Sequence, residues 1–165
     1  MKKKCILFFS ISFILFLTSL GLLIKYPVVI INHNGRVLYE NILNRELTVI
    51  LRYIHSVEKT PIVEVYSIKS DGIYLEKFLW QSFGAGLPLE PISDNALITE
   101  IQGFYCMSNI HKKLGSNLIA WYIPENECKV QINDKFIIGI NDEGLLEIRL
   151  VYTSLVEFLL KQFFR

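Results

Sequence analysis

The residue types best suited to chemistry lie close together in one short stretch of the chain. A histidine, a serine and two glutamates stand there: His55, Ser56, Glu58 and Glu64. Histidine and glutamate can exchange protons with a substrate and serine can act as a nucleophile, so the group could support hydrolysis. The spacing matches no nucleophile motif, however. We therefore favour a simpler interpretation, in which His55 and Glu58 satisfy the backbone groups of a tight loop.

The same histidine and glutamates could also approach one metal ion. Three ligands on so short a stretch can converge, but nothing in their spacing fixes a coordination geometry. The sequence also lacks the paired cysteine and histidine spacings of a structural zinc site. We therefore expect neither a metal nor another cofactor.

Two predicted strands must position these residues. The segments 46–55 (ELTVILRYIH) and 61–69 (PIVEVYSIK) are rich in β-branched and aromatic residues, and we pair them as antiparallel strands. One register places Arg52 opposite Glu64 on a shared face, which predicts a cross-strand ion pair. A shift of one residue would remove this pair.

A second unusual segment follows, with the sequence Ser82-Phe83-Gly84-Ala85-Gly86-Leu87-Pro88. Its two glycines permit positive φ angles or a close approach of the backbone. A phosphate-binding loop would lead into a helix, whereas Pro88 and Pro91 follow here. We predict a shaped loop that lines a small-molecule pocket or grips the neighbouring His55 loop.

The rest of the body predicts an all-β fold. Short strand-like runs alternate with turn signals such as Asn34-Gly35 and Asp71-Gly72. Segment 96–107 is predicted as one of these strands. Many short strands at close spacing indicate an antiparallel sandwich or barrel. Cys106 and Cys128 lie in two of the strands, and they form either one disulfide or two buried small hydrophobic residues.

The N-terminal segment predicts a membrane anchor. Residues 5–24 carry no charge and are long enough to span a bilayer as a helix, and three lysines precede them. These lysines predict a single-pass protein of the cell membrane, with its N-terminus in the cytoplasm and the bulk of the chain outside. A cleaved signal peptide is the alternative, although the best small-residue cleavage site lies inside the apolar run and is weak.

The C-terminal segment predicts a short amphipathic helix. Ser154 and Glu157 have the spacing of a capping box, and apolar residues cover most of the helix that follows. We expect this helix to close one end of the β core; the alternative is a helix lying on the membrane beside the anchor. The resulting divisions are an anchor at 1–25, a β-rich domain at 26–151 and a terminal helix at 152–165.

Charge excludes one class of partner. Four of the 17 basic residues (Lys2, Lys3, Lys4 and Lys25) flank the apolar leader, so the remainder of the chain, with 16 acidic residues, is mildly acidic. Binding to nucleic acid requires clustered lysine and arginine, and we therefore expect no nucleic-acid partner.

The two unusual segments resemble the signatures of an uncharacterised family, catalogued as domain of unknown function 1850. Residues 55–64 (HSVEKTPIVE) resemble its HSVE-(K/R)-(S/T)-P-V-x-E pattern, and residues 82–88 (SFGAGLP) resemble its second signature, in the same order. The resemblance covers roughly residues 27–151. It implies small exported or membrane-anchored proteins, often encoded beside, or fused to, permeases of the TAXI class of tripartite ATP-independent periplasmic (TRAP) transporters.

The resemblance therefore implies an accessory role in solute uptake rather than catalysis. The expected partner is a TRAP-type permease or its solute receptor, with the two motif loops as the binding surface. The motif positions that become binding candidates are His55, Ser56, Glu58, Pro61, Glu64, Ser82, Phe83, Gly84, Gly86 and Pro88. An extracytoplasmic hydrolase using His55, Glu58 and Glu64 and a structural envelope protein are the alternatives.

Overall fold

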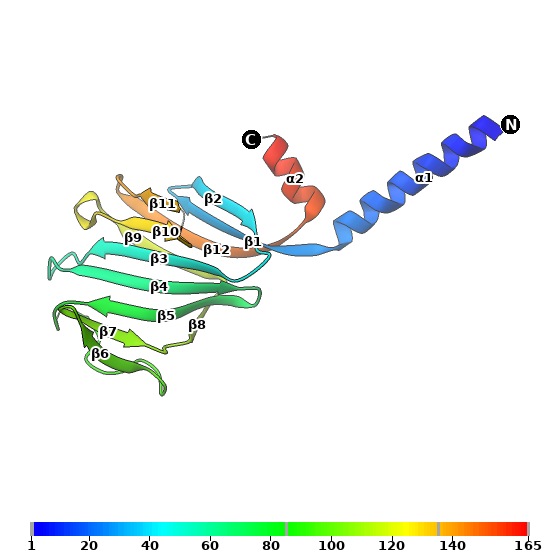
Figure 1. The fold of residues 1–165 in the computed structure, drawn as a ribbon. Helices are drawn as coiled ribbons and strands as arrows, with labels where there is room; N and C mark the ends of the chain where they lie inside the picture. Colours follow the sequence, from blue (N-terminus) through cyan, green and yellow to red (C-terminus); the bar gives the residue numbers. More distant parts are fainter. Residues whose placement is uncertain (1, 85, 135, 165) are drawn as a thin grey trace.

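The computed structural model describes residues 2–84, 86–134 and 136–164, with side chains described from residue 9 onward except that of residue 136. Two antiparallel sheets form the body, and a helix projects from one end (Figure 1). The smaller sheet has the strand order β2-β1-β12-β9 and the larger has the order β11-β10-β3-β4-β5-β7-β6, with β8 also paired to β5. The all-β prediction is confirmed.

The strands of the smaller sheet are β1 (Lys25–His33), β2 (Arg36–Ile42), β9 (Asn117–Tyr122) and β12 (Gly144–Ser154). Those of the larger sheet are β3 (Leu47–Ile54), β4 (Pro61–Lys69), β5 (Gly72–Trp80), β6 (Leu97–Ile101), β7 (Phe104–Ser108), β8 (Lys112–Gly115), β10 (Lys129–Ile132) and β11 (Phe136–Gly139). The helices are α1 (Lys2–Leu23), the short 3-10 helix η1 (Pro124–Asn126) and α2 (Leu155–Phe163).

The main core lies between the two sheets, because inward-facing residues of both belong to one cluster. Ile31 and Ile148 come from the smaller sheet, whereas Val49, Ile68 and Val130 come from the larger one. All five side chains are almost completely buried. This face-to-face packing of apolar side chains is that of a sandwich.

A second, smaller cluster lies under the far part of the larger sheet. It consists of Ile62, Trp80, Ala96, Met107 and Ile110. These residues come from β4, from the last position of β5, from the position just before β6, and from β7 and the residues after it. The cluster therefore ties the segment between β5 and β6 to the sheet.

The register of β3 and β4 differs from the predicted one by one residue. Arg52 faces Val63, and Glu64 faces Leu51. The predicted Arg52–Glu64 ion pair is therefore wrong, and Arg52 instead donates a hydrogen bond to Gln131 on β10. The loop sets the register: the His55 amide donates to the Thr60 carbonyl at 2.8 Å, which brings Ile54 opposite Pro61.

Two tight turns show how local sequence shapes the sheets. The predicted turn at Asn34-Gly35 is confirmed between β1 and β2, with φ angles of 51° and 78°. The predicted single strand at 96–107 is wrong, because Gln102 and Gly103 form a second turn with φ angles of 52° and 79° between β6 and β7. Positive φ at both central residues is the geometry of a hairpin turn.

Both body cysteines are buried and free. Cys106 lies in β7, and Cys128 precedes β10 in the core between the sheets. Of the two predicted alternatives, the structure has the pair of buried small side chains and not the disulfide.

Helix α1 projects from the body where β1 begins (Figure 1). Its predicted helical conformation is confirmed from residue 2 to residue 23, while the side chains of the flanking lysines at 2–4 and of Cys5 lie outside the described residues. Among the residues described, no helix has the length and hydropathy required to cross a membrane.

Helix α2 has the predicted capping box. The Ser154 hydroxyl accepts from the Glu157 amide at 3.1 Å, and the Glu157 carboxylate accepts from the Ser154 amide at 3.0 Å. The expectation that α2 closes the β core is wrong, because none of its described residues is buried. It leans instead on α1, where a Cβ atom added at Gly21 would lie 3.2 Å from the Val156 side chain.

Candidate functional site

The two motif loops meet at the end of the sandwich opposite α1 (Figure 1). The Ser82 hydroxyl, just after β5, donates a hydrogen bond of 3.0 Å to the Glu58 carboxylate in the β3–β4 loop. Gly84 packs against the same carboxylate, because a Cβ atom there would lie 2.7 Å from Glu58 Oε1. The predicted grip between the loops is thus present, and glycine at position 84 leaves room for it.

His55 organises the first loop. Its Nδ1 atom accepts from the amides of Val57 at 3.3 Å and Glu58 at 3.1 Å, and its carbonyl accepts from the Lys59 amide at 3.0 Å. Because Nδ1 is an acceptor, the neutral ring carries its hydrogen on Nε2. The geometry gives His55 the loop-holding role that the sequence favours.

The second loop is fixed by its aromatic residue and a short turn. The Phe83 ring lies 4.2 Å from the Tyr105 ring and 5.8 Å from the Trp80 ring, measured between centroids. The Leu87 amide donates to the Gly84 carbonyl at 2.9 Å. Ala85 lies outside the described residues, while Gly86 has a φ of 87°, which glycine adopts without strain.

A cavity of about 350 Å³ adjoins the first loop. It is lined by Tyr53, His55, Ser56, Trp121, Tyr122, Ile123 and Asn126. Asn126 fixes its floor, since its amide donates to the Ile54 carbonyl at 2.7 Å and accepts from the Ile123 amide at 3.1 Å. This cavity lies beside the His55 loop, and the described residues of the Gly84 loop, which were predicted to line a pocket or grip the His55 loop, do not line it.

Glu64 lies on the inner face of β4, away from the loops. Its carboxylate accepts from the Tyr53 hydroxyl at 3.0 Å and from the Tyr66 hydroxyl at 2.7 Å. Burial raises the pKa of Glu64, and the two tyrosine hydrogen bonds only partly oppose this shift.

Cys128 and Tyr122 complete this buried group. Burial raises the pKa of Cys128 to about 12 and raises that of Tyr122 as well, and the Glu64 charge adds to both shifts. The Tyr53 and Tyr122 rings pack edge to face with centroids 5.4 Å apart. The group is a set of neutral donors around one carboxyl group, and it carries no positive charge.

The structure thus separates the predicted catalytic cluster. His55 and Glu58 share a loop but point their side chains at different partners, and Glu64 lies on the core face of a strand. In the part of the chain that is described, no three His, Cys, Asp or Glu side chains are close enough to hold a metal ion. The described contacts bring Glu58, Ser82 and Gly84 together, with Ser56 and Phe83 at the surface.

The remaining motif residues mark boundaries. Pro61 begins β4, and Gly86 and Pro88 lie further along the β5–β6 segment. The residues near Glu64 that sequence reasoning missed are Tyr53 and Tyr122. Tyr66 was expected on the same face as Glu64, since residues two apart share a strand face. Tyr122 comes from the other sheet and has no local signal.

The raised pKa of Glu64 predicts how stability depends on pH. The folded protein binds this proton more tightly than the unfolded chain, whose carboxyl keeps its ordinary value of 4.5. The stability it contributes is therefore fully present below that pH and is lost as the pH rises through the folded-state pKa. As the pH rises from 4.5 through the folded-state pKa, the free energy of unfolding should fall less for Glu64→Gln than for the wild type. Urea unfolding at several pH values measures this difference.

The exposed Glu90 provides the matched control. Glu90→Gln should lose stability in parallel with the wild type over the same pH range. A Glu64→Gln curve that also runs parallel to the wild type would contradict the assignment of this loss to Glu64.

Comparison with known proteins places these loops in a family. Residues 49–138 match the family model described as Domain of unknown function (DUF1850). No curated protein and no solved structure matches the chain significantly. The matched region covers more than half of the chain and extends from β3 to β11, so it contains both loops and the buried Glu64. The protein therefore belongs to the DUF1850 family.

Proposed function

We propose that this protein is a membrane-anchored, extracytoplasmic binding module that assists a TAXI-type TRAP permease and performs no catalysis itself. The observation that carries the proposal is the joining of the two motif loops through Glu58, Ser82 and Gly84. The link to a TRAP system follows from the family resemblance and from no contact in the structure.

The polar groups of the loops hold the loops themselves. Glu58 accepts from Ser82, and His55 Nδ1 accepts from loop amides, so these atoms are engaged before any substrate arrives. Apolar side chains are presented outward instead, with Val57 67% exposed and Phe83 45% exposed. Apolar groups held on a fixed backbone favour association with a protein partner, because little ordering entropy is lost on binding.

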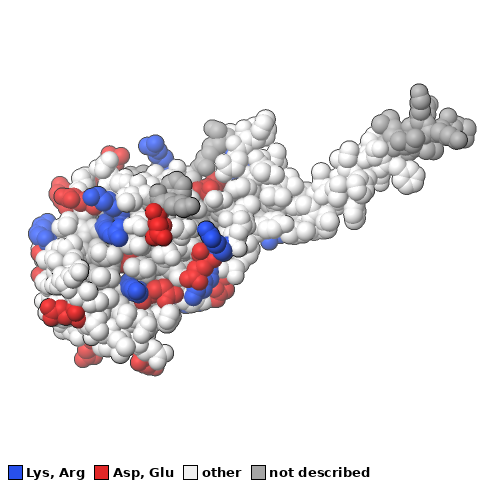
Figure 2. All heavy atoms as spheres, in the orientation of Figure 1, with Lys and Arg blue, Asp and Glu red and all other residues white. Residues whose placement is uncertain are grey.

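The N-terminal helix supports the anchor. The described side chains of α1, from residue 9 onward, are nearly all exposed although none is charged. Figure 2 shows charged side chains of both signs scattered over the body and none along the described part of this helix. A helix that is apolar on all sides requires apolar surroundings, which a bilayer provides.

Helix α2 fits the same surroundings. Leu159, Leu160 and Phe163 are 55%, 51% and 84% exposed, and α2 leans on α1 rather than on the core. Apolar side chains beside an anchor can enter the surface of the bilayer, as interfacial helices do. We therefore propose that α2 lies at the membrane, with the N-terminus of the chain in the cytoplasm and the body outside.

The loops lie at the end of the body that is far from the anchor. The chain passes from the anchor end of the sandwich to the His55 loop along β3, whose eight residues span about 26 Å at ~3.3 Å per residue. The loops therefore face away from the anchor. A solute receptor outside the membrane could reach them, and so could the outer surface of a permease.

A pull-down experiment tests the loops as the binding surface. Tagged full-length protein is recovered from gently solubilised native membranes, and co-purified proteins are identified by mass spectrometry. Val57→Lys should reduce recovery of the permease or solute receptor by about tenfold or more, because a charge is placed in an apolar contact. Ile137, which is also 67% exposed but lies on β11, provides the control Ile137→Lys.

Equal recovery with both variants, or recovery of neither transporter component with the wild type, would contradict the proposed partner. Circular dichroism of both variants confirms that the fold is kept.

Membrane extraction tests the anchor. After alkaline carbonate extraction, the wild-type chain should remain in the membrane pellet with its full mass of 19.2 kDa. Phe13→Lys with Phe16→Lys should release the chain into the supernatant, because charges in the bilayer core cost about 2.5–3.5 kcal/mol each. A shortened wild-type chain in the supernatant would show cleavage and contradict the anchor.

A further inference from the structure

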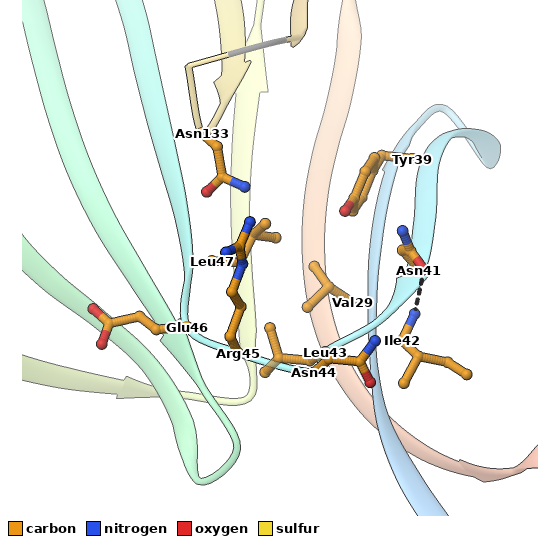
Figure 3. A pocket seen from close by; sticks show the side chains of 10 residues that line it. All are labelled: Val29, Tyr39, Asn41, Ile42, Leu43, Asn44, Arg45, Glu46, Leu47 and Asn133. Carbon is orange, nitrogen blue, oxygen red and sulfur yellow. Dashed lines mark hydrogen bonds between the residues drawn. The ribbon is translucent and has the colours of Figure 1, made fainter.

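A second cavity lies at the anchor end of the sandwich, away from the motif loops. Residues 43–46 cross there from β2 in one sheet to β3 in the other, and they border a space of about 190 Å³ (Figure 3). The lining residues are Val29, Tyr39, Asn41, Ile42, Leu43, Asn44, Arg45, Glu46, Leu47 and Asn133. This volume is below the ~300–1,000 Å³ typical of drug-sized ligands, so it suits a small one.

Among the described residues that line the cavity, Arg45 is the one cation. Figure 3 shows its guanidinium directed into the cavity toward Asn133. Arg45 is exposed, and within the described part of the chain it makes neither a side-chain hydrogen bond nor an ion pair. A guanidinium presents a planar fork of donors that matches carboxylate and phosphate oxygens.

Amide donors face the same space. Asn133 Oδ1 accepts from the Thr48 amide at 3.0 Å, which fixes the orientation of its side chain. The Nδ2 of Asn133 consequently points toward the Arg45 guanidinium (Figure 3). Asn41 Oδ1 accepts from the Ile42 amide at 2.8 Å, and its Nδ2 is left as a further donor. Water can satisfy these solvent-accessible donors, and an oxyanion between Arg45 and Asn133 would replace that water with stronger, charge-assisted hydrogen bonds.

Glu46 is the acidic residue among the described residues that line this cavity. Glu46 points away from it in Figure 3 and accepts a hydrogen bond from Ser67 on β4. Asp134 lines an adjoining hollow that also includes Arg45, and it forms no ion pair with that residue. The Tyr39 hydroxyl adds another polar group at the cavity.

We propose that this cavity binds a small oxyanion, a carboxylate or a phosphate, between the Arg45 guanidinium and the amide of Asn133. The proposal is independent of the loop function, because the cavity shares no lining residue with the loop site. Since the cavity lies near the start of β1, the oxyanion could belong to a free solute or to a lipid headgroup at the membrane.

Isothermal titration calorimetry on the full-length protein in neutral detergent micelles tests the proposal in three arms. The probes are succinate, inorganic phosphate and short-chain phosphatidylglycerol. At least one probe should bind saturably with a Kd tighter than about 1 mM. Arg45→Gln should weaken that binding by about 10–100-fold, the loss expected for hydrogen bonds to a charged group.

The control is Arg36→Gln, since Arg36 is an exposed arginine on β2 outside the cavity lining. It should bind the probe as the wild type does. Binding of succinate or inorganic phosphate would identify a free solute as the source of the oxyanion. Binding of phosphatidylglycerol alone would identify a lipid headgroup. Failure of all three probes to bind, or equal binding by the wild type and Arg45→Gln, would overturn the proposal.

Discussion

The arrangement of the two motif loops depends on the carboxylate of Glu58. It accepts a hydrogen bond from the Ser82 hydroxyl, and Gly84, which has no side chain, packs against it. A partly buried carboxylate that receives a hydrogen bond holds its neighbours more firmly than a neutral group would, because hydrogen bonds to charged groups are roughly twice as strong. Two loops that are distant in sequence thereby become one surface.

The sandwich makes this contact possible. Strands β3, β4 and β5 are sequential neighbours in the larger sheet, so the β3–β4 loop and the end of β5 emerge at the same edge. The buried Trp80 at the end of β5 packs against the rings of Phe83 and Tyr105. This packing holds the second loop against the sheet. The same strands point their other ends at the anchor, which separates the loop surface from the Arg45 cavity.

Local chemistry made much of this fold predictable. The Asn34-Gly35 turn and the Ser154–Glu157 capping box depend on residues a few positions apart, and both are present as expected. The β-rich body also follows from local patterns. The grip between the two motif loops was one of two predicted roles for residues 82–88, and glycine was the signal for the close approach.

Strand register and tertiary packing were not predictable in the same way. The hydrogen bond from the His55 amide to the Thr60 carbonyl gives a β3–β4 register one residue away from the predicted one. Glu64 therefore lies opposite Leu51 rather than Arg52, and its carboxylate binds tyrosine hydroxyls instead. Helix α2 has an apolar surface that fits either a core or a membrane, and only the three-dimensional arrangement shows that it leaves the core uncovered. The Arg45 cavity joins residues from three strands and carries no sequence motif.

The central claim, that Glu58 couples the two loops into one surface, is tested most directly by a double-mutant cycle. Glu58→Ala, Ser82→Ala and the double variant are compared by urea unfolding of the full-length protein. We predict a coupling energy of about 1–2 kcal/mol, the range for neighbours that share a hydrogen bond to a charged group. Additivity of the two single changes to within about 0.3 kcal/mol would contradict the coupling and leave the loops as independent segments.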